Sequence, residues 1–140
     1  MIPRRIAVLA LAGAVLVFGA AVTHASQVSQ TARSIKILSA KAEKGVVTVR
    51  VSIVGWKMYP TLVGKAPKPD GGHWHIYVNG RYNNFSTSAT RGQTNPKKKL
   101  GPGEYRISAV LANNNHTEPK PKVLSAPVIV TVESAAHTTG

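Results

Sequence analysis

The chain contains no cysteine and only five acidic residues among its 140 positions. The missing thiols exclude disulfides, thiolate metal ligands and cysteine nucleophiles, so packing alone must stabilise the fold. Five carboxylates offer little material for a catalytic carboxylate pair, and no serine lies in a nucleophile elbow. We therefore expect a protein that is not an enzyme.

The scarcity of negative charge leaves 18 Lys and Arg largely unbalanced, for a formal net charge of +13. Such a balance favours acidic partners, among them anionic lipid surfaces, cell-wall polymers and acidic polysaccharides. Nucleic acid is an electrostatic possibility, but no recognition motif accompanies it, and we expect no nucleic-acid partner. The alternative is a solvated basic surface that keeps the protein soluble. The densest run, Lys97-Lys98-Lys99, is expected in a solvated turn.

The N-terminus has the pattern of a secretory signal. A short basic segment, residues 1–5, precedes an uncharged apolar run over 6–22, and Thr23-His24-Ala25 places small residues at a cleavage point. We expect residues 1–25 to be a helical signal peptide that directs export to the periplasm, the cell surface or the medium. Its removal takes away two of the 13 net positive charges and leaves +11. The alternative is an uncleaved membrane anchor.

Beyond the signal, we expect a flexible lead-in over 26–33, one domain over 34–133 and a frayed tail over 134–140. Apolar and polar residues alternate along the domain with period two, which indicates half-buried strands. A long Pro- and Gly-rich loop over 57–72 is expected to cross between two sheets. The expected strands are 34–40, 46–54, 72–79, 81–86, 104–112 and 127–133, with one edge strand within 87–99.

About seven short strands separated by turns predict an immunoglobulin-like antiparallel β-sandwich. Trp74 is expected to be its large core anchor, and Tyr105 is placed like the tyrosine that such folds use at a corner. Asn79-Gly80 predicts a tight two-residue turn, because both residues tolerate positive φ.

Three histidines form the candidate site. His73 and His75 lie two apart on one expected strand, so their rings project from the same face, with Tyr77 beside them. His116 follows the 104–112 strand, and it reaches the other two if that strand pairs antiparallel with 72–79 and its alternation continues. Three imidazoles suit zinc or copper(II), with nickel a third choice, and they leave a position for water.

Other interpretations of these residues stay open. The histidines could instead bond to loop backbone and fix the 57–72 segment. A small ligand or glycan could bind a pocket built by His73, His75, Tyr77 and Trp56. Trp56 is expected instead to be a rim residue that packs under the proline loop. Met58 offers a soft sulfur ligand that would favour copper(I). Asp70 and Glu118 are the only carboxylates close to the histidines in sequence.

Three segments also resemble a family of exported bacterial domains of unknown function. They are Gly72-His73-Trp74-His75, Leu100-Gly101-Pro102-Gly103 and Leu111-Ala112-Asn113-Asn114-Asn115-His116, which match the family's Gly-His-x-His strand, Leu-x-Pro-Gly turn and Leu-Ala-x-x-x-His strand end. The resemblance covers residues 70–133. It implies an immunoglobulin-like sandwich in which the three histidines act as one set, and it supplies no activity.

Two functional hypotheses follow. The first is an exported binding domain that holds a divalent transition metal, copper or zinc, at His73, His75 and His116. The second is a structural or adhesive module of the cell envelope whose basic surface contacts anionic polymers, with purely structural histidines.

Overall fold

The computed structural model describes residues 32–135 of the chain. The predicted signal peptide, most of the predicted lead-in and the end of the predicted tail lie outside this range. Within the described residues, no helix is both long enough and apolar enough to cross a membrane.

The described part of the chain forms eight strands and one short 3-10 helix. Their bounds are β1 (Ser34–Glu43), β2 (Val46–Val54), β3 (Lys57–Met58), η1 (Pro60–Leu62), β4 (Gly71–Val78), β5 (Arg81–Ser86), β6 (Arg91–Gln93), β7 (Gly103–Asn113) and β8 (Val128–Val132). All six principal strands predicted from the alternation are present, and the edge strand expected within 87–99 is β6. The eighth strand, β3, lies in the segment that the sequence predicted to be loop.

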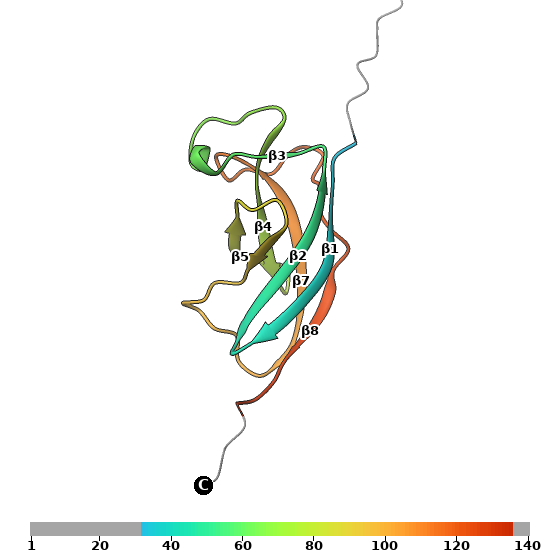
Figure 1. Cartoon of the computed structure of the whole chain (residues 1–140), viewed down its shortest axis with the longest axis vertical. Coiled ribbons are helices and arrows are strands. Elements are labelled where there is room, and N and C mark those ends of the chain that lie inside the picture. The colour runs from blue at the N-terminus through green and yellow to red at the C-terminus, as the bar shows by residue number, and fades with distance from the viewer. Residues whose placement is uncertain (1–31, 136–140) are drawn as a thin grey trace, which may run out of the picture.

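The strands form two sheets that face each other (Figure 1). Sheet A has the order β1-β2-β6, and sheet B has the order β5-β4-β7-β8, with β3 pairing to the start of β4. In immunoglobulin nomenclature these are the A-B-E and C′-C-F-G sheets, so the all-β sandwich is immunoglobulin-like, as expected. One pairing departs from the prediction, because β3 runs parallel to β4 in an otherwise antiparallel fold.

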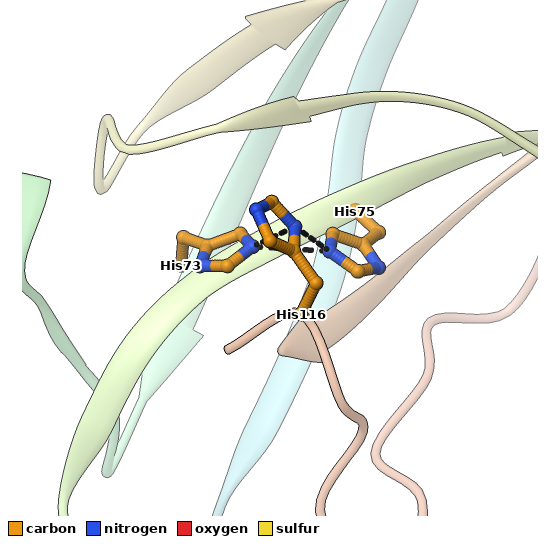
Figure 2. Close-up of side chains that lie close together, drawn as sticks. All are labelled: His73, His75 and His116. Carbon is orange, nitrogen blue, oxygen red and sulfur yellow. Dashed lines mark hydrogen bonds between the residues drawn. The ribbon is translucent and has the colours of Figure 1, made fainter. Parts of the chain in front are cut away.

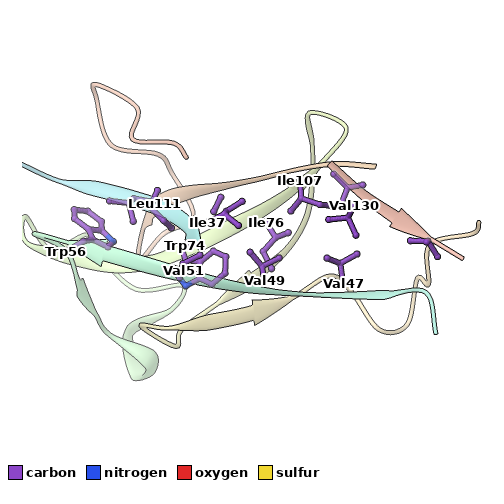
Figure 3. Packing of buried hydrophobic residues seen from close by; sticks show 14 residues of the cluster. Ile37, Val47, Val49, Val51, Trp56, Trp74, Ile76, Ile107, Leu111 and Val130 are labelled. Atoms are coloured by element: carbon purple, nitrogen blue, oxygen red, sulfur yellow. The ribbon is translucent and has the colours of Figure 1, made fainter. Parts of the chain in front are cut away.

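The core consists of the inward-facing residues of both sheets (Figure 3). Trp74 and Ile76 of β4 are fully buried, and they lie between the sheets with Val49 of β2 and Leu111 of β7. Trp74 is thus the core anchor that the sequence predicted. Because the core takes the even-numbered residues of β4, the odd-numbered residues face the outer side of sheet B.

Two turns confirm predictions made from local sequence. Asn79 and Gly80 both have positive φ, of 51° and 77°, and join β4 to β5 as a tight hairpin. Tyr105 donates a hydrogen bond from its hydroxyl to the Gly101 carbonyl at 2.9 Å, which is the contact a corner tyrosine makes in such sandwiches.

The chain crosses from sheet A to sheet B at residues 55–56 and not, as predicted, within the segment from 57 to 72, because β2 ends at Val54 and β3 already belongs to sheet B. The 57–72 segment is also not structureless. Its start pairs with β4 as β3, and η1 follows. Gly71 and Gly72 permit this close approach, because a Cβ at Gly71 would overlap the Lys57 carbonyl and one at Gly72 would overlap the Ala112 carbonyl. The absence of side chains here lets β4 lie between β3 and β7.

We expect Gly72→Ala to reduce the free energy of unfolding by about 1–3 kcal/mol, because the new methyl group forces β4 away from β7. Gly101→Ala is the matched control, since a Cβ there meets only the Tyr105 hydroxyl at an ordinary 4.0 Å and Gly101 has no positive φ. Denaturant unfolding of both variants measures the difference. Equal stability of the two variants would contradict the close approach at Gly72.

Candidate functional site

The outer face of β4 presents two buried histidines. His73 is fully buried and His75 is 3% exposed, and both project from the face opposite Trp74. On the core side, Trp56 donates a hydrogen bond from Nε1 to the His73 carbonyl at 3.2 Å. The backbone beneath the first histidine is therefore held by a core tryptophan.

His116 reaches the same place through a turn. Strand β7 pairs antiparallel with β4, with Gly72 opposite Asn113, so the end of β7 lies beside the start of β4. The prediction that strand alternation continues to His116 is wrong, because β7 ends at Asn113 and His116 has a left-handed φ of 64°. Its amide donates to the Asn113 carbonyl at 2.9 Å, and this turn directs the imidazole back over β4.

Asparagines hold that turn in place. Asn114 is fully buried, and its side-chain Nδ2 donates to the Ala66 carbonyl at 3.3 Å. The backbone carbonyl of Asn114 accepts a hydrogen bond from the Gly64 amide at 2.7 Å. The Asn113 and Thr117 side chains bond to each other at 2.9 Å. The strand predicted over 104–112 ends just before this asparagine run, and the sequence pattern predicts no turn there. Asparagine side chains often bond to backbone two residues on, as Asn115 does with the Thr117 amide, and this was the signal that could have indicated a turn.

The three imidazoles converge on one point (Figure 2). The Nε2 atoms of His73 and His75 lie 3.0 Å apart, and His116 Nδ1 lies 3.2 Å from the first and 3.3 Å from the second. The predicted convergence of the three histidines is therefore correct in its geometry.

The environment keeps the two buried rings neutral. Burial lowers the pKa of His73 to about 4, and the neighbouring imidazoles of His75 and His116 act in the same direction. Burial, followed by the proximity of His116, also lowers the pKa of His75 to about 4. Neutral imidazole retains a lone pair, which is the form that binds metal.

Hydrogen bonds between the rings satisfy the buried imidazoles only in part. Each neutral imidazole has one N–H and one acceptor nitrogen, and the Nδ1 atoms of His73 and His75 are buried without any partner. If both protons are on Nδ1, two Nε2 lone pairs face each other at 3.0 Å. A cation at the meeting point removes that repulsion. The alternative in which these two rings bond to the 57–72 backbone is not what the structure has, since neither ring makes such a bond.

The nitrogen triangle has the dimensions of a metal-binding face. Two nitrogens that are each about 2.0–2.1 Å from one metal lie about 3.3 Å apart at a tetrahedral angle and about 2.9 Å apart at a right angle. The three nitrogen–nitrogen separations, from 3.0 to 3.3 Å, fall within this interval. In a square-planar site, two of any three nitrogens lie on opposite sides of the metal, about 4.1 Å apart. The set therefore resembles one face of a tetrahedron or octahedron.

The other residues singled out in the sequence take different positions. Tyr77 lies beside the cluster, with its ring centroid 6.4 Å from that of His75. Trp56 is 7% exposed and belongs to the core, so it is a packing residue and not a wall of a surface pocket. Met58 packs against the same core. Asp70 pairs with Lys57 at 3.1 Å and is not a member of the histidine set.

A groove of about 710 Å³ opens beside the cluster, along His75 and His116. Its further lining includes Tyr77, Tyr82 and Glu118. The Tyr77 hydroxyl donates a short hydrogen bond to Glu118, and Lys122 pairs with the same carboxylate at 3.0 Å. Burial alone would raise the pKa of Glu118, but these two bonds hold it below its ordinary value. Tyr82 was missed in the sequence because its approach to His75 depends on the β4–β5 pairing.

Comparison with known proteins gives a family and one fold neighbour. The family model of a domain of unknown function, DUF4399, matches residues 49–133. This match begins before residues 70–133, the segment that carries the sequence resemblance. A fibronectin(III)-like module structure of Clostridium thermocellum CbhA is similar over 79% of this chain at 13% identity and a TM-score of 0.43. The chain spans about half, 53%, of the length of that structure. No curated protein matches the chain significantly.

We expect the metal-free domain to lose stability as the pH falls from about 6.5 to about 4. Over this window an unfolded histidine takes up a proton, whereas folded His73 and His75 resist protonation until their pKa of about 4. The slope is at most about 1.4 kcal/mol per pH unit for each histidine. Urea unfolding with a chelator present, from pH 7.5 to 4, measures it. The double variant His73→Gln/His75→Gln should show a shallower fall; an equal fall in both proteins would contradict the assignment.

Proposed function

The chain belongs to this family of domains of unknown function, and we propose that it binds one divalent transition metal ion through His73, His75 and His116. The observation that carries the proposal is the nitrogen triangle with sides of 3.0, 3.2 and 3.3 Å. Two of its three members are buried and neutral, and their Nδ1 atoms have no hydrogen-bond partner, so hydrogen bonds between the rings leave both imidazoles partly unsatisfied. Such an arrangement is unfavourable without a cation and well matched to one.

Among metals, the near-equal sides of the triangle favour zinc. Zinc accepts a tetrahedral set of three imidazoles and one further ligand, whereas tetragonal copper(II) prefers ligands in one plane. Copper remains the second choice, since imidazole suits it chemically. Met58 adds no support for copper(I), because its side chain packs on the core.

We infer further that this is an exported, non-enzymatic binding module. The basic and apolar N-terminal pattern supports export. The only carboxylate that lines the groove, Glu118, is already engaged by Tyr77 and Lys122, which leaves no free acid–base pair beside the histidines.

We expect the full chain to bind one Zn²⁺ with a dissociation constant below about 1 µM, and to melt at a higher temperature when loaded, since the ion binds only the folded state. His116→Ala removes one ligand without disturbing the core, because His116 is exposed. Its affinity should fall by at least about 100-fold. Calorimetric titration with Zn²⁺ and Cu²⁺ measures both proteins.

The matched control is His137→Ala, which removes an imidazole that is not one of the three. It should bind like the parent chain. If neither metal binds below about 1 µM, or if His116→Ala binds as tightly as the control, the metal proposal is wrong.

A second candidate function, contact with an anionic envelope polymer, rests on the outer face of sheet A. Arg50 of β2 lies directly opposite Arg91 of β6, and both are exposed. Lys36 and Lys41 of β1 project from the same face. Like charges placed opposite each other destabilise a sheet, and neither ion pair in the described residues involves these strands. A polyanion lying across the face would relieve this repulsion.

We expect Arg91→Thr to stabilise the domain by a few tenths of a kcal/mol, because it removes the opposed charge, and to weaken retention on immobilised dextran sulfate. Retention should fall steeply as salt increases. Arg81→Thr is the control, since Arg81 is an equally exposed arginine that begins β5 on sheet B. Equal retention of the two variants, or retention independent of salt, would rule out sheet A as the polymer-binding face.

A further inference from the structure

A metal held by the three histidines would have one open side. With nitrogens 3.0 to 3.3 Å apart and bonds of about 2.0–2.1 Å, the ion lies about 0.9 Å out of the nitrogen plane. The pyramidal set leaves at least one coordination position for another ligand. What that ligand is depends on what surrounds the site.

The surroundings close one side of the cluster and open another. Phe85 packs edge-on against both His73 and His116, with ring centroids 5.3 Å from each. His73 is fully buried, whereas His75 and His116 line the groove. Figure 2 shows the His116 ring reaching across the two β4 histidines. A ligand on the ion therefore enters along the groove, over His75 and His116.

The groove is of a size for a small organic molecule. Its volume of about 710 Å³ falls within the range of about 300–1,000 Å³ that is usual for small-molecule sites. Two tyrosine rings form its aromatic wall: Tyr82 packs edge-on at 4.9 Å from His75, and Tyr77 lies 6.3 Å from Tyr82. Tyr82 remains 51% exposed, so its ring offers apolar surface that the fold itself does not cover. Such a wall favours a planar ring.

The charges in the groove favour an anion. Glu118 is paired with Lys122 at 3.0 Å and accepts the Tyr77 hydroxyl, so its charge is largely offset. Lys120 also lines the groove, and neither ion pair found in residues 32–135 includes it. A divalent ion at one end and a free ammonium group along the wall together attract a carboxylate.

We propose that the groove and the metal together bind a small aromatic carboxylate. One carboxylate oxygen occupies the open metal position, Lys120 offsets the remaining charge, and the ring lies against Tyr82. This inference rests on the proposed metal site and adds the class of ligand that the site receives. The proposal is for binding only, and the ligand undergoes no covalent change.

The test uses the full chain loaded with Co²⁺, which takes the same imidazole sites as zinc and reports its ligands through visible absorption. Benzoate is the probe, with acetate and benzyl alcohol as comparison ligands. Benzoate should change the spectrum and bind about tenfold more tightly than acetate, because only benzoate has a ring to place on Tyr82. Benzyl alcohol, which lacks the charge, should leave the spectrum unchanged.

Two variants separate the contributions. Lys120→Met should weaken benzoate about fivefold, while Lys65→Met, at an exposed lysine that does not line the groove, should have no effect. Tyr82→Ser should make benzoate and acetate bind equally. Both substituted side chains are exposed, so the fold tolerates their loss.

The outcomes distinguish the two proposals. If Co²⁺ binds and benzoate leaves its spectrum unchanged, the ligand proposal is overturned while the metal site stands. Unaltered benzoate binding in Lys120→Met and Tyr82→Ser, or equal binding to the metal-free chain, overturns it as well. If Co²⁺ and Zn²⁺ both fail to bind, the metal site fails and the ligand proposal with it.

Discussion

The pairing of β4 with β7 is the constraint on which the candidate site depends. Its register places Gly72 opposite Asn113 and His73 opposite Ala112, so the turn after β7 lies over the start of β4. A shift of one residue would turn the histidines of β4 into the core and Trp74 out of it. The hydrophobic pattern that fixes the core therefore fixes the site on the other face of the same strand. The glycines at 71 and 72 allow both neighbouring strands to approach at that point.

The site is stable only because the rest of the sandwich supports it. Two buried imidazoles have Nδ1 atoms without partners, and the Oδ1 atom of the fully buried Asn114 in the adjoining turn has none either. Groups of this kind reduce stability unless something binds them. The buried apolar core beneath, which includes Trp56, Trp74 and Val132, offsets this loss of stability. Local unfavourable features held by a well-packed scaffold are common at binding sites, and this contrast supports a functional role for the cluster.

The two outer faces of the sandwich differ in chemistry. Sheet A presents opposed arginines and surrounding lysines, whereas sheet B presents the histidine cluster, tyrosines and a groove. The first arrangement suits an extended polyanion that makes many weak contacts, and the second suits one ion and one small molecule. Because the core separates the two faces, both roles can coexist in one domain.

Much of the fold followed from local pattern. Valines alternating along 46–54, the Trp74-Ile76-Val78 face and the Asn79-Gly80 turn each predicted their structure, because side-chain alternation and positive φ are properties of neighbouring residues. The same alternation put His73 and His75 on one face. The short parallel strand β3 could not be predicted this way, since its pairing partner β4 follows only after the loop over 59–70 and does not lie beside it in sequence.

The sequence by itself determined that two imidazoles share a strand face and that a third follows a strand able to pair with it. Only the tertiary structure decided how His116 arrives, through a left-handed turn tied by Asn114 to the backbone of Ala66 and not by continued strand alternation. It also decided that Trp56 belongs to the core while Met58 packs against it, and that Tyr82 and Lys120 border the groove. These positions depend on contacts between segments far apart in the chain, which local periodicity does not encode.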